Sequence, residues 1–213
     1  MYQIEEIAER IRQSFEDRTA ARDRALASSR SLTRHCANAI RAIHRDEYAL
    51  AQLHIDEAQA IIRLLKADLA PFPDLYYSGY TQDTLKEFAE ANATFALVQA
   101  RDLSTPDELG VEHATFIQGL AEAAGELRRR CMDLLRSGHS QEAERLLGCM
   151  DDIYTVLVTM DYPDGVTGGL RRLTDIVRGV TERTRGDMTI SLRQAQLEDS
   201  LRALQARLDG AQP

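Results

Sequence analysis

The sequence lacks an apolar run of about 20 residues, the length that crosses a bilayer, and its N-terminus, Met-Tyr-Gln-Ile-Glu-Glu, is acidic. We therefore expect neither a membrane span nor a signal peptide. An excess of basic residues is lacking too, since 26 Lys and Arg face 34 Asp and Glu and give a net charge of −8. This balance argues against a uniformly basic nucleic-acid-binding coat or a polybasic membrane anchor, but it allows a basic stripe on one face. A soluble, cytoplasmic protein is expected.

Cysteine and histidine are scarce and scattered. The three cysteines, Cys36, Cys131 and Cys149, are odd in number and far apart, which suits a reducing compartment and predicts small core residues. No two of the five histidines stand four apart, and none pairs with a cysteine at zinc spacing, so a histidine-rich metal site is not expected. The GxGxxG, GxxxxGK[ST] and GxSxG patterns are absent, which leaves the common nucleotide-binding and acyl-transfer sites without support.

Proline is also scarce, with only five residues, and the stretches between them are rich in Ala, Leu, Arg, Glu and Gln, which favour helices. The one β-branched run, Tyr154-Thr-Val-Leu-Val-Thr, lies within a helical pattern. The fold class predicted is all-α, a bundle of six or seven helices in a single domain over residues 1–213, with residues from about 209 to 213 frayed.

Periodicity, capping residues and breakers give the helix boundaries. Apolar positions three and four apart predict one or two long helices within 4–69. Thr81 is a candidate N-cap, and Thr105-Pro106 carries a start signal with proline at the first helical position. The remaining predicted helices cover 81–101, 111–136, 140 to before 162, and 167–208 with a break near 186–187.

Four arginines form a stripe in the first long helix. Arg30, Arg34, Arg41 and Arg45 lie within a sector of about 60° at 100° per residue, opposite the apolar set from Leu32 to Ile43. Arginine forks match phosphate oxygens, so this stripe is a candidate nucleic-acid-binding ridge. The alternative is the ordinary solvated face of a long helix, which is the more common reason for such spacing.

Two pairs of glutamates mark a second candidate site. Glu87 and Glu90 are three apart, and Glu122 and Glu126 are four apart, so each pair projects from one side of its helix. If the two pairs converge, four oxygen ligands without histidine suit Mg²⁺ or Mn²⁺. The alternative is plain surface charge, because the apolar positions of the second helix place Glu122 and Glu126 opposite its buried side. In that case Glu126 would pair with Arg129 or Arg130.

Several blocks, in order along most of the chain, resemble the translin family. Residues 29–45 resemble the family's first helix down to the closing His44-Arg45, and Lys86-Glu-Phe-Ala-Glu-Ala resembles its Gln-Glu-Tyr-Val-Glu-Ala stretch. Residues 116–128 resemble Tyr-Leu-x-Gly-Val-Ala-Asp-Leu-x-Gly-Glu-Leu, and residues 161–187 resemble a signature of prokaryotic members. The similarity is to the Trax-like branch (translin-associated factor X), prokaryotic type.

This resemblance implies a translin-type helical fold, a homo-oligomeric and octameric shell, and binding of single-stranded RNA or single-stranded DNA. In Trax-type subunits it implies a Mg²⁺-dependent endoribonuclease, a hydrolase whose acids correspond to Glu87, Glu90, Glu122 and Glu126. Glu122 departs from the aspartate of Trax, which leaves the metal geometry open. The alternative function is a non-catalytic, translin-like protein that binds single-stranded RNA or DNA.

Overall fold

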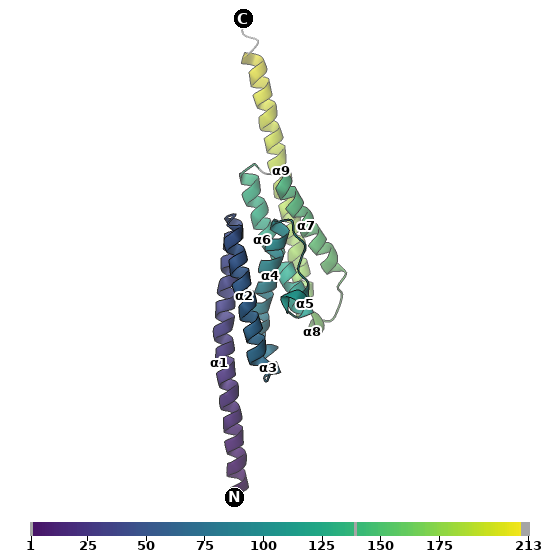
Figure 1. Cartoon of the computed structure of the whole chain (residues 1–213). Coiled ribbons are helices and arrows are strands. Elements are labelled where there is room, and N and C mark those ends of the chain that lie inside the picture. Colours follow the sequence, from purple (N-terminus) through teal and green to yellow (C-terminus); the bar gives the residue numbers. More distant parts are fainter. Residues whose placement is uncertain (1, 139, 210–213) are drawn as a thin grey trace.

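Figure 1 shows the computed structural model, which describes residues 2–138 and 140–209. Within these ranges the chain forms helices and no strand. Six long helices are joined by loops and by three one-turn helices. In chain order they are α1 (Tyr2–His44), α2 (Tyr48–Leu69), α3 (Pro73–Tyr76), α4 (Gly79–Val98), α5 (Pro106–Leu109), α6 (His113–Arg136), α7 (Ser140–Val158), α8 (Asp164–Thr167) and α9 (Leu170–Asp209). The all-α prediction is confirmed.

The bundle is built around α6. This helix packs against α4, α7 and α9, while α1 packs against α2 and α4 on the other side of the bundle. Small and branched apolar residues three and four apart give α1 its buried stripe: Ala25, Leu32, Cys36, Ala39 and Ile43. Phe88 of α4 is fully buried between the two groups of helices. The core therefore joins all six long helices into one unit.

The predicted helices are present, and their boundaries differ from the prediction in detail. The 4–69 stretch is two helices, one of the two arrangements expected, separated at Asp46, whose φ of 61° ends α1. Thr81 is not an N-cap: α4 begins at Gly79, and the Thr81 hydroxyl donates to the carbonyl of Leu75 instead. Thr105 does cap α5, in a capping box with Glu108.

Contrary to the prediction, α9 has no break at Gly186. Arg128 of α6 donates to the Thr184 hydroxyl and to the Asp187 carboxylate, so α6 holds α9 on both sides of the glycine. The Met188 side chain is buried just beyond it. The predicted frayed tail began at about 209, but Asp209 is the last residue of α9; residues 210–213 and the predicted Ser140 cap lie outside the residues and side chains that the structure describes.

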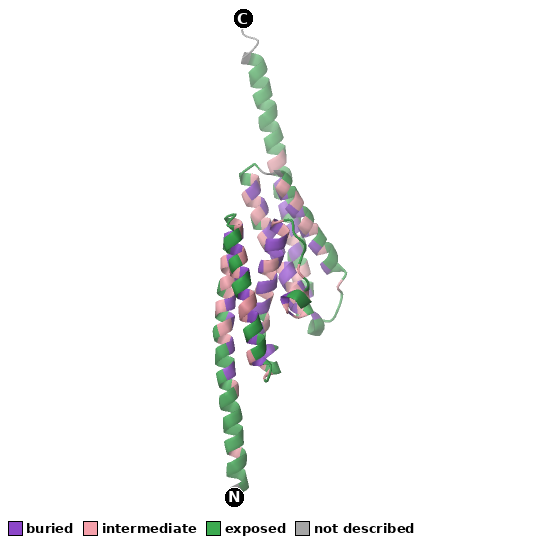
Figure 2. Cartoon of the chain, viewed as in Figure 1, coloured by how far each residue is buried: buried purple, intermediate pink, exposed green. Residues whose placement is uncertain are grey.

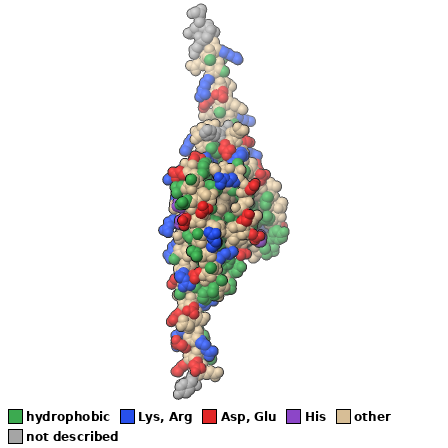
Figure 3. Space-filling model, viewed as in Figure 1, with side chains coloured by type: hydrophobic (Ala, Val, Ile, Leu, Met, Phe, Trp, Pro, Cys, Tyr) green, Lys and Arg blue, Asp and Glu red, His purple; other side chains and the backbone are tan. Residues whose placement is uncertain are grey.

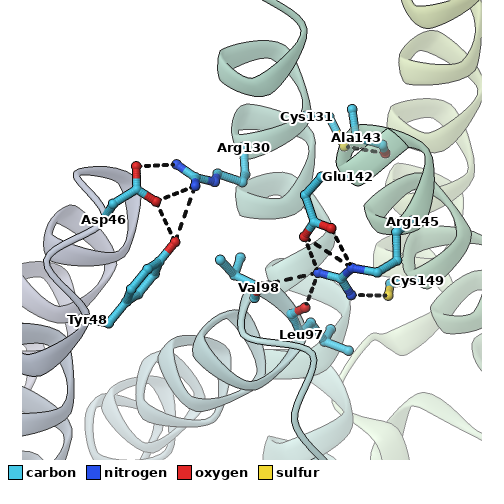
Figure 4. A network of polar contacts seen from close by, with 10 residues as sticks. All are labelled: Asp46, Tyr48, Leu97, Val98, Arg130, Cys131, Glu142, Ala143, Arg145 and Cys149. Atoms are coloured by element: carbon cyan, nitrogen blue, oxygen red, sulfur yellow. Dashed lines mark hydrogen bonds and ion pairs between the residues drawn. The ribbon is translucent and has the colours of Figure 1, made fainter. Parts of the chain in front are cut away.

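Two polar networks fix the ends of helices to the bundle (Figure 4). Arg130 of α6 binds Asp46 and the Tyr48 hydroxyl, which ties the turn between α1 and α2 to α6. Arg145 of α7 donates to the carbonyls of Leu97 and Val98 at the C-terminal end of α4, where unpaired carbonyls attract a cation. The turn after α1 and the C-terminal end of α4 are thus each anchored by an arginine.

Each terminal helix extends beyond the bundle as an exposed arm, and the arms point in opposite directions (Figure 2). The first turns of α1 carry Ile4, Ile7, Ile11 and Phe15, and the last turns of α9 carry Ile190, Leu197, Leu201, Leu204 and Leu208, all exposed. Acidic and basic side chains are intermixed over the central body on the face shown in Figure 3. None of the helices in 2–138 and 140–209 combines the length and the apolar character that a bilayer crossing needs.

The helices α4 and α6 approach each other tightly at Gly119. A Cβ atom at this position would lie 2.6 Å from the Lys86 carbonyl oxygen, 2.7 Å from the Ala89 Cβ and 2.9 Å from the Glu90 amide nitrogen. These atoms are mostly backbone, so they cannot yield by a side-chain rotation. Glycine is therefore required here for the two helix backbones to touch.

We predict that Gly119→Ala separates α4 from α6 and lowers the free energy of unfolding by about 1–3 kcal/mol, the usual cost of overpacking. Urea denaturation measures this change. Gly148→Ala in α7 is the matched control, because a Cβ there meets nothing within 4 Å. The control should gain up to about 1 kcal/mol from helix propensity. Equal stability of the two variants would contradict the required contact.

Candidate metal and nucleic-acid site

The four glutamates singled out from the sequence lie on the two helices that meet at Gly119. Glu87 and Glu90 belong to α4, and Glu122 and Glu126 belong to α6. All four are partly buried. The charges of Glu122, Glu126 and Glu87 all act on Glu90, so the structure brings the two pairs into one electrostatic cluster.

Glu90 is at the centre of this cluster. Burial raises the pKa of its carboxyl to about 8, and the charges of Glu122, Glu126 and Glu87 contribute in the same direction. Burial also raises the pKa of Glu87, with Glu122 and Asp83 adding to the effect against Lys86. In the absence of a cation, the site therefore holds more negative charge than its surroundings stabilise.

Lys86 is the cation paired with Glu122. Its Nζ atom lies 2.7 Å from Glu122 Oε1, and its side chain is 20% exposed. Burial lowers the pKa of Lys86, but the hydrogen bond to Glu122 and the nearby carboxylates outweigh this and raise it. Lys86 is therefore a permanent positive charge at the edge of the acid cluster.

His44, the last residue of α1, contacts Glu126. Its Nε2 atom lies 2.5 Å from Glu126 Oε2, and only 4% of its side chain is exposed. This hydrogen bond holds the pKa of Glu126 below its ordinary value, although burial opposes the effect, and Arg129 contributes from 4.0 Å. The His44 Nδ1 atom is buried without a hydrogen-bond partner among the described residues.

The placement of Glu122 and Glu126 opposite the buried side of their helix, expected from periodicity, is wrong. Their side chains are only 29% and 25% exposed, because α6 is covered by α4 on one side and by α7 and α9 on the others. Of the two partners expected for Glu126, Arg129 does lie at ion-pair distance, 4.0 Å from Glu126 Oε2, whereas Arg130 binds Asp46 and Tyr48 instead. The apolar pattern had marked only one of the faces that α6 buries.

The donor set suits a hard divalent cation. It consists of carboxylate oxygens, which Mg²⁺ prefers, and their mutual repulsion is what a cation would relieve. Across residues 2–138 and 140–209, however, no three His, Cys, Asp or Glu side chains are close enough together to hold an ion as they stand. Lys86 and His44 instead occupy one oxygen each of Glu122 and Glu126. The carboxylate oxygens are thus ligands of the type that Mg²⁺ prefers, but the Glu122 and Glu126 side chains must reorient before they can bind the ion.

A pocket of about 330 Å³ opens beside the acids. Glu90 and Glu122 line one side of it, together with Ala121, Ala124 and Gly125 of α6. The other wall is a stripe of four aliphatic residues of α9: Leu173, Ile176, Val177 and Val180. The volume lies at the lower end of the range of roughly 300–1,000 Å³ for small-molecule sites.

The arginines lie on the exposed side of α1, as predicted. Arg30, Arg34 and Arg41 are surface residues that bond only to uncharged groups of α1, namely the Leu26 carbonyl, Ser31 and Asn38. Arg45 lies one residue beyond the end of the helix, in the turn to α2. Among the described residues, none of the four forms an ion pair with a carboxylate, so their guanidinium groups remain available to phosphates.

Sequence reasoning missed the contacts that Lys86 and His44 make with the acids. Neither spacing nor composition identifies them, because each partner lies on another helix, 36 and 82 residues away. The available signals were weak: Lys86 directly precedes Glu87, and His44 directly precedes the last arginine of the stripe.

The chain matches no model of a known protein family. It is 32% identical over 194 residues to the uncharacterized protein MJ0175 of Methanocaldococcus jannaschii, with 90% of this chain and 86% of that protein covered. A solved structure of AfC3PO in complex with duplex RNA is similar, with a TM-score of 0.83 and 31% identity over 89% of this chain and 98% of that chain. AfC3PO alone gives a TM-score of 0.79 at 30% identity, with the same coverage.

The structure of apo-NeC3PO has the same fold, with a TM-score of 0.79 at 18% identity over 86% of this chain and 96% of that chain. AfC3PO is a translin/Trax-type complex, and the present chain spans nearly all of its similar subunit. The chain therefore belongs to the translin family.

Proposed function

We propose that the chain is a Mg²⁺-dependent endoribonuclease of the Trax-like, prokaryotic type that cleaves single-stranded RNA inside a homo-octameric shell. The observation that carries this proposal is the cluster of Glu87, Glu90, Glu122 and Glu126 on two touching helices, with Glu90 held at a pKa of about 8. A strongly perturbed carboxyl beside a pocket is typical of a functional site. The duplex RNA in the AfC3PO complex supports RNA as the class of substrate.

A bound divalent cation would polarise a phosphoryl oxygen and lower the pKa of a water molecule. Glu87, Glu90, Glu122 and Glu126 are the residues that would hold it, with one of them available as a general base. His44 orients Glu126 through their hydrogen bond, and Lys86 places positive charge where an anionic RNA strand must approach the acids. In the metal-free protein, Glu90 holds a proton near neutral pH.

Arg30, Arg34, Arg41 and Arg45 would bind the RNA strand through its phosphates. Their position at the surface and their freedom from carboxylate partners in the described chain support this role. Binding of this kind depends on salt and tolerates any sequence, and it extends to single-stranded DNA because DNA has the same phosphates.

The exposed arms support assembly into a homo-oligomer. Apolar side chains such as Leu197, Leu201 and Leu204 recur three and four apart on α9, the spacing of a helix-packing seam. Packing this stripe against a partner would remove its apolar surface from water, which is favourable. A second copy of the chain carries the same stripe.

The nuclease proposal predicts that Glu90→Gln lowers cleavage of single-stranded RNA in Mg²⁺ by at least about 100-fold, because it removes a ligand and a candidate base while keeping the side-chain shape. A fluorescent RNA, single-stranded or duplex, incubated with Mg²⁺ or EDTA, measures this. Glu144→Gln, at an exposed position of α7, is the matched control and should keep full activity. RNA binding without cleavage under any divalent cation would instead identify a non-catalytic binding protein.

We also predict that Glu90→Gln changes how the free energy of unfolding depends on pH. The pKa of Glu90 is raised from 4.5 to about 8 on folding, so the folded state keeps a proton that the unfolded state loses. The free energy of unfolding in EDTA should thus fall as pH rises between these values, by at most about 1.4 kcal/mol per pH unit. Excess Mg²⁺ should reduce this loss, and Glu90→Gln should lack it. An unchanged slope in the variant would show that Glu90 is not the group responsible.

The ridge predicts that Arg34→Ala combined with Arg41→Ala weakens RNA binding and reduces the slope of log affinity against log salt by roughly 0.7 for each phosphate that is no longer bound. Filter binding at several salt concentrations measures both quantities. Arg171→Ala combined with Arg178→Ala removes the same charge from an exposed face of α9 as a control. Equal effects in the two variants would show a general charge effect rather than a binding ridge.

For the arms, Leu201→Glu combined with Leu204→Glu should reduce the mass measured by light scattering, because buried charges would disrupt the seam. Ala203→Glu combined with Ala206→Glu adds the same charge to the opposite face of the same turns and should leave the assembly intact. A wild-type protein with the 23.9 kDa mass of one chain would rule out the shell itself.

A further inference from the structure

The pocket between α6 and α9 combines two surfaces of different chemistry. Among the described lining residues, Glu90 and Glu122 supply the only ionisable groups, and the others are alanine, glycine or aliphatic. Ile176, on the α9 wall, is 47% exposed although it lies within the packed part of the helix. The pocket thus has an aliphatic wall, formed by α9 and open to solvent, directly beside Glu90 and Glu122, two of the proposed cation ligands.

A nucleic acid offers three kinds of group to such a pocket. Phosphate is excluded, because the two ionisable groups are acidic and none of the described lining residues is basic. Ribose is too polar for the aliphatic wall. A nucleobase fits both surfaces, because its faces are apolar and its edge carries N–H groups that carboxylate oxygens can accept.

We propose that this pocket is a subsite for one nucleobase of the bound RNA strand, namely the base next to the phosphate that lies at the acid cluster. The faces of the base pack against Ile176 and Val180, and its edge donates to the Glu90 or Glu122 carboxyl group. Every base has an N–H group on this edge, so the subsite selects for the presence of a base rather than its identity. This inference rests on the proposed function, since it places RNA at the same acids.

Gly125 allows the pocket to be closed without disturbing the fold. A Cβ at this position meets nothing within 4 Å, so Gly125→Leu extends into the pocket from the α6 wall. Gly148→Leu in α7 is the matched control, because it is also an exposed helical glycine with open space but lies outside the pocket. Ile176→Asp replaces the aliphatic surface of the α9 wall with a negative charge and serves as a second, independent variant.

The test uses photo-crosslinking of single-stranded RNA that contains 4-thiouridine, with and without Mg²⁺, followed by mass spectrometry of the crosslinked peptides. We expect crosslinks within residues 173–180 of the wild-type chain and of Gly148→Leu. Gly125→Leu and Ile176→Asp should reduce these crosslinks by about 10-fold or more while the total amount of bound RNA stays the same.

A second measurement uses RNA with one abasic nucleotide. Cleavage at the adjacent phosphate should fall by about 10-fold or more in the wild type, and this difference between abasic and intact RNA should vanish in Gly125→Leu. Crosslinks to 173–180 without any cleavage would overturn the nuclease proposal and keep the subsite. Cleavage without these crosslinks would overturn the subsite proposal. Crosslinks that are unchanged in both the Gly125 and the Ile176 variants would overturn it as well. Light scattering that shows disassembly in Gly125→Leu would assign the pocket to a second copy of the chain and would also overturn it.

Discussion

The contact of Gly119 with the backbone of α4 is the constraint on which the candidate site depends. Two helices that carry acids on facing sides would normally be held apart by their side chains and by charge repulsion. Here the missing Cβ lets the α6 backbone reach the Lys86 carbonyl and the Glu90 amide. Glu122 follows one turn later, next to Lys86 and Glu90. Helix packing therefore sets the proximity of the four acids, and the repulsion between their charges is a free-energy cost that destabilises the fold.

That cost is reduced by basic groups placed at the margins of the cluster. Lys86 neutralises Glu122 from within α4, and His44 holds Glu126 from the end of α1. Glu90 is the acid that burial affects most: burial, together with the charges of Glu122, Glu126 and Glu87, raises the pKa of its carboxyl to about 8 against the opposing charge of Lys86. Proteins often retain such unfavourable arrangements where a function requires them. The folded state gains from any cation that enters the cluster.

Local sequence signals predicted the parts of this structure that depend on one helix at a time. The exposed face of Arg30, Arg34 and Arg41, the capping box at Thr105 and the buried stripe of α1 all follow from spacing alone. The partial burial of Glu122 and Glu126 did not follow from spacing. Helix α6 is covered by α4, α7 and α9, and a single apolar stripe identifies only one of these buried sides. The contacts of His44 and Lys86 join residues far apart in the chain, so they required the packed structure.

Helix α1 joins three features along one unbroken rod of 43 residues, about 65 Å at 1.5 Å per residue. Its first turns form an apolar arm, its C-terminal third carries Arg30, Arg34 and Arg41, and its last residue touches Glu126. The exposed arm and the imidazole that contacts Glu126 therefore belong to the same continuous helix, which the bundle holds along its C-terminal half.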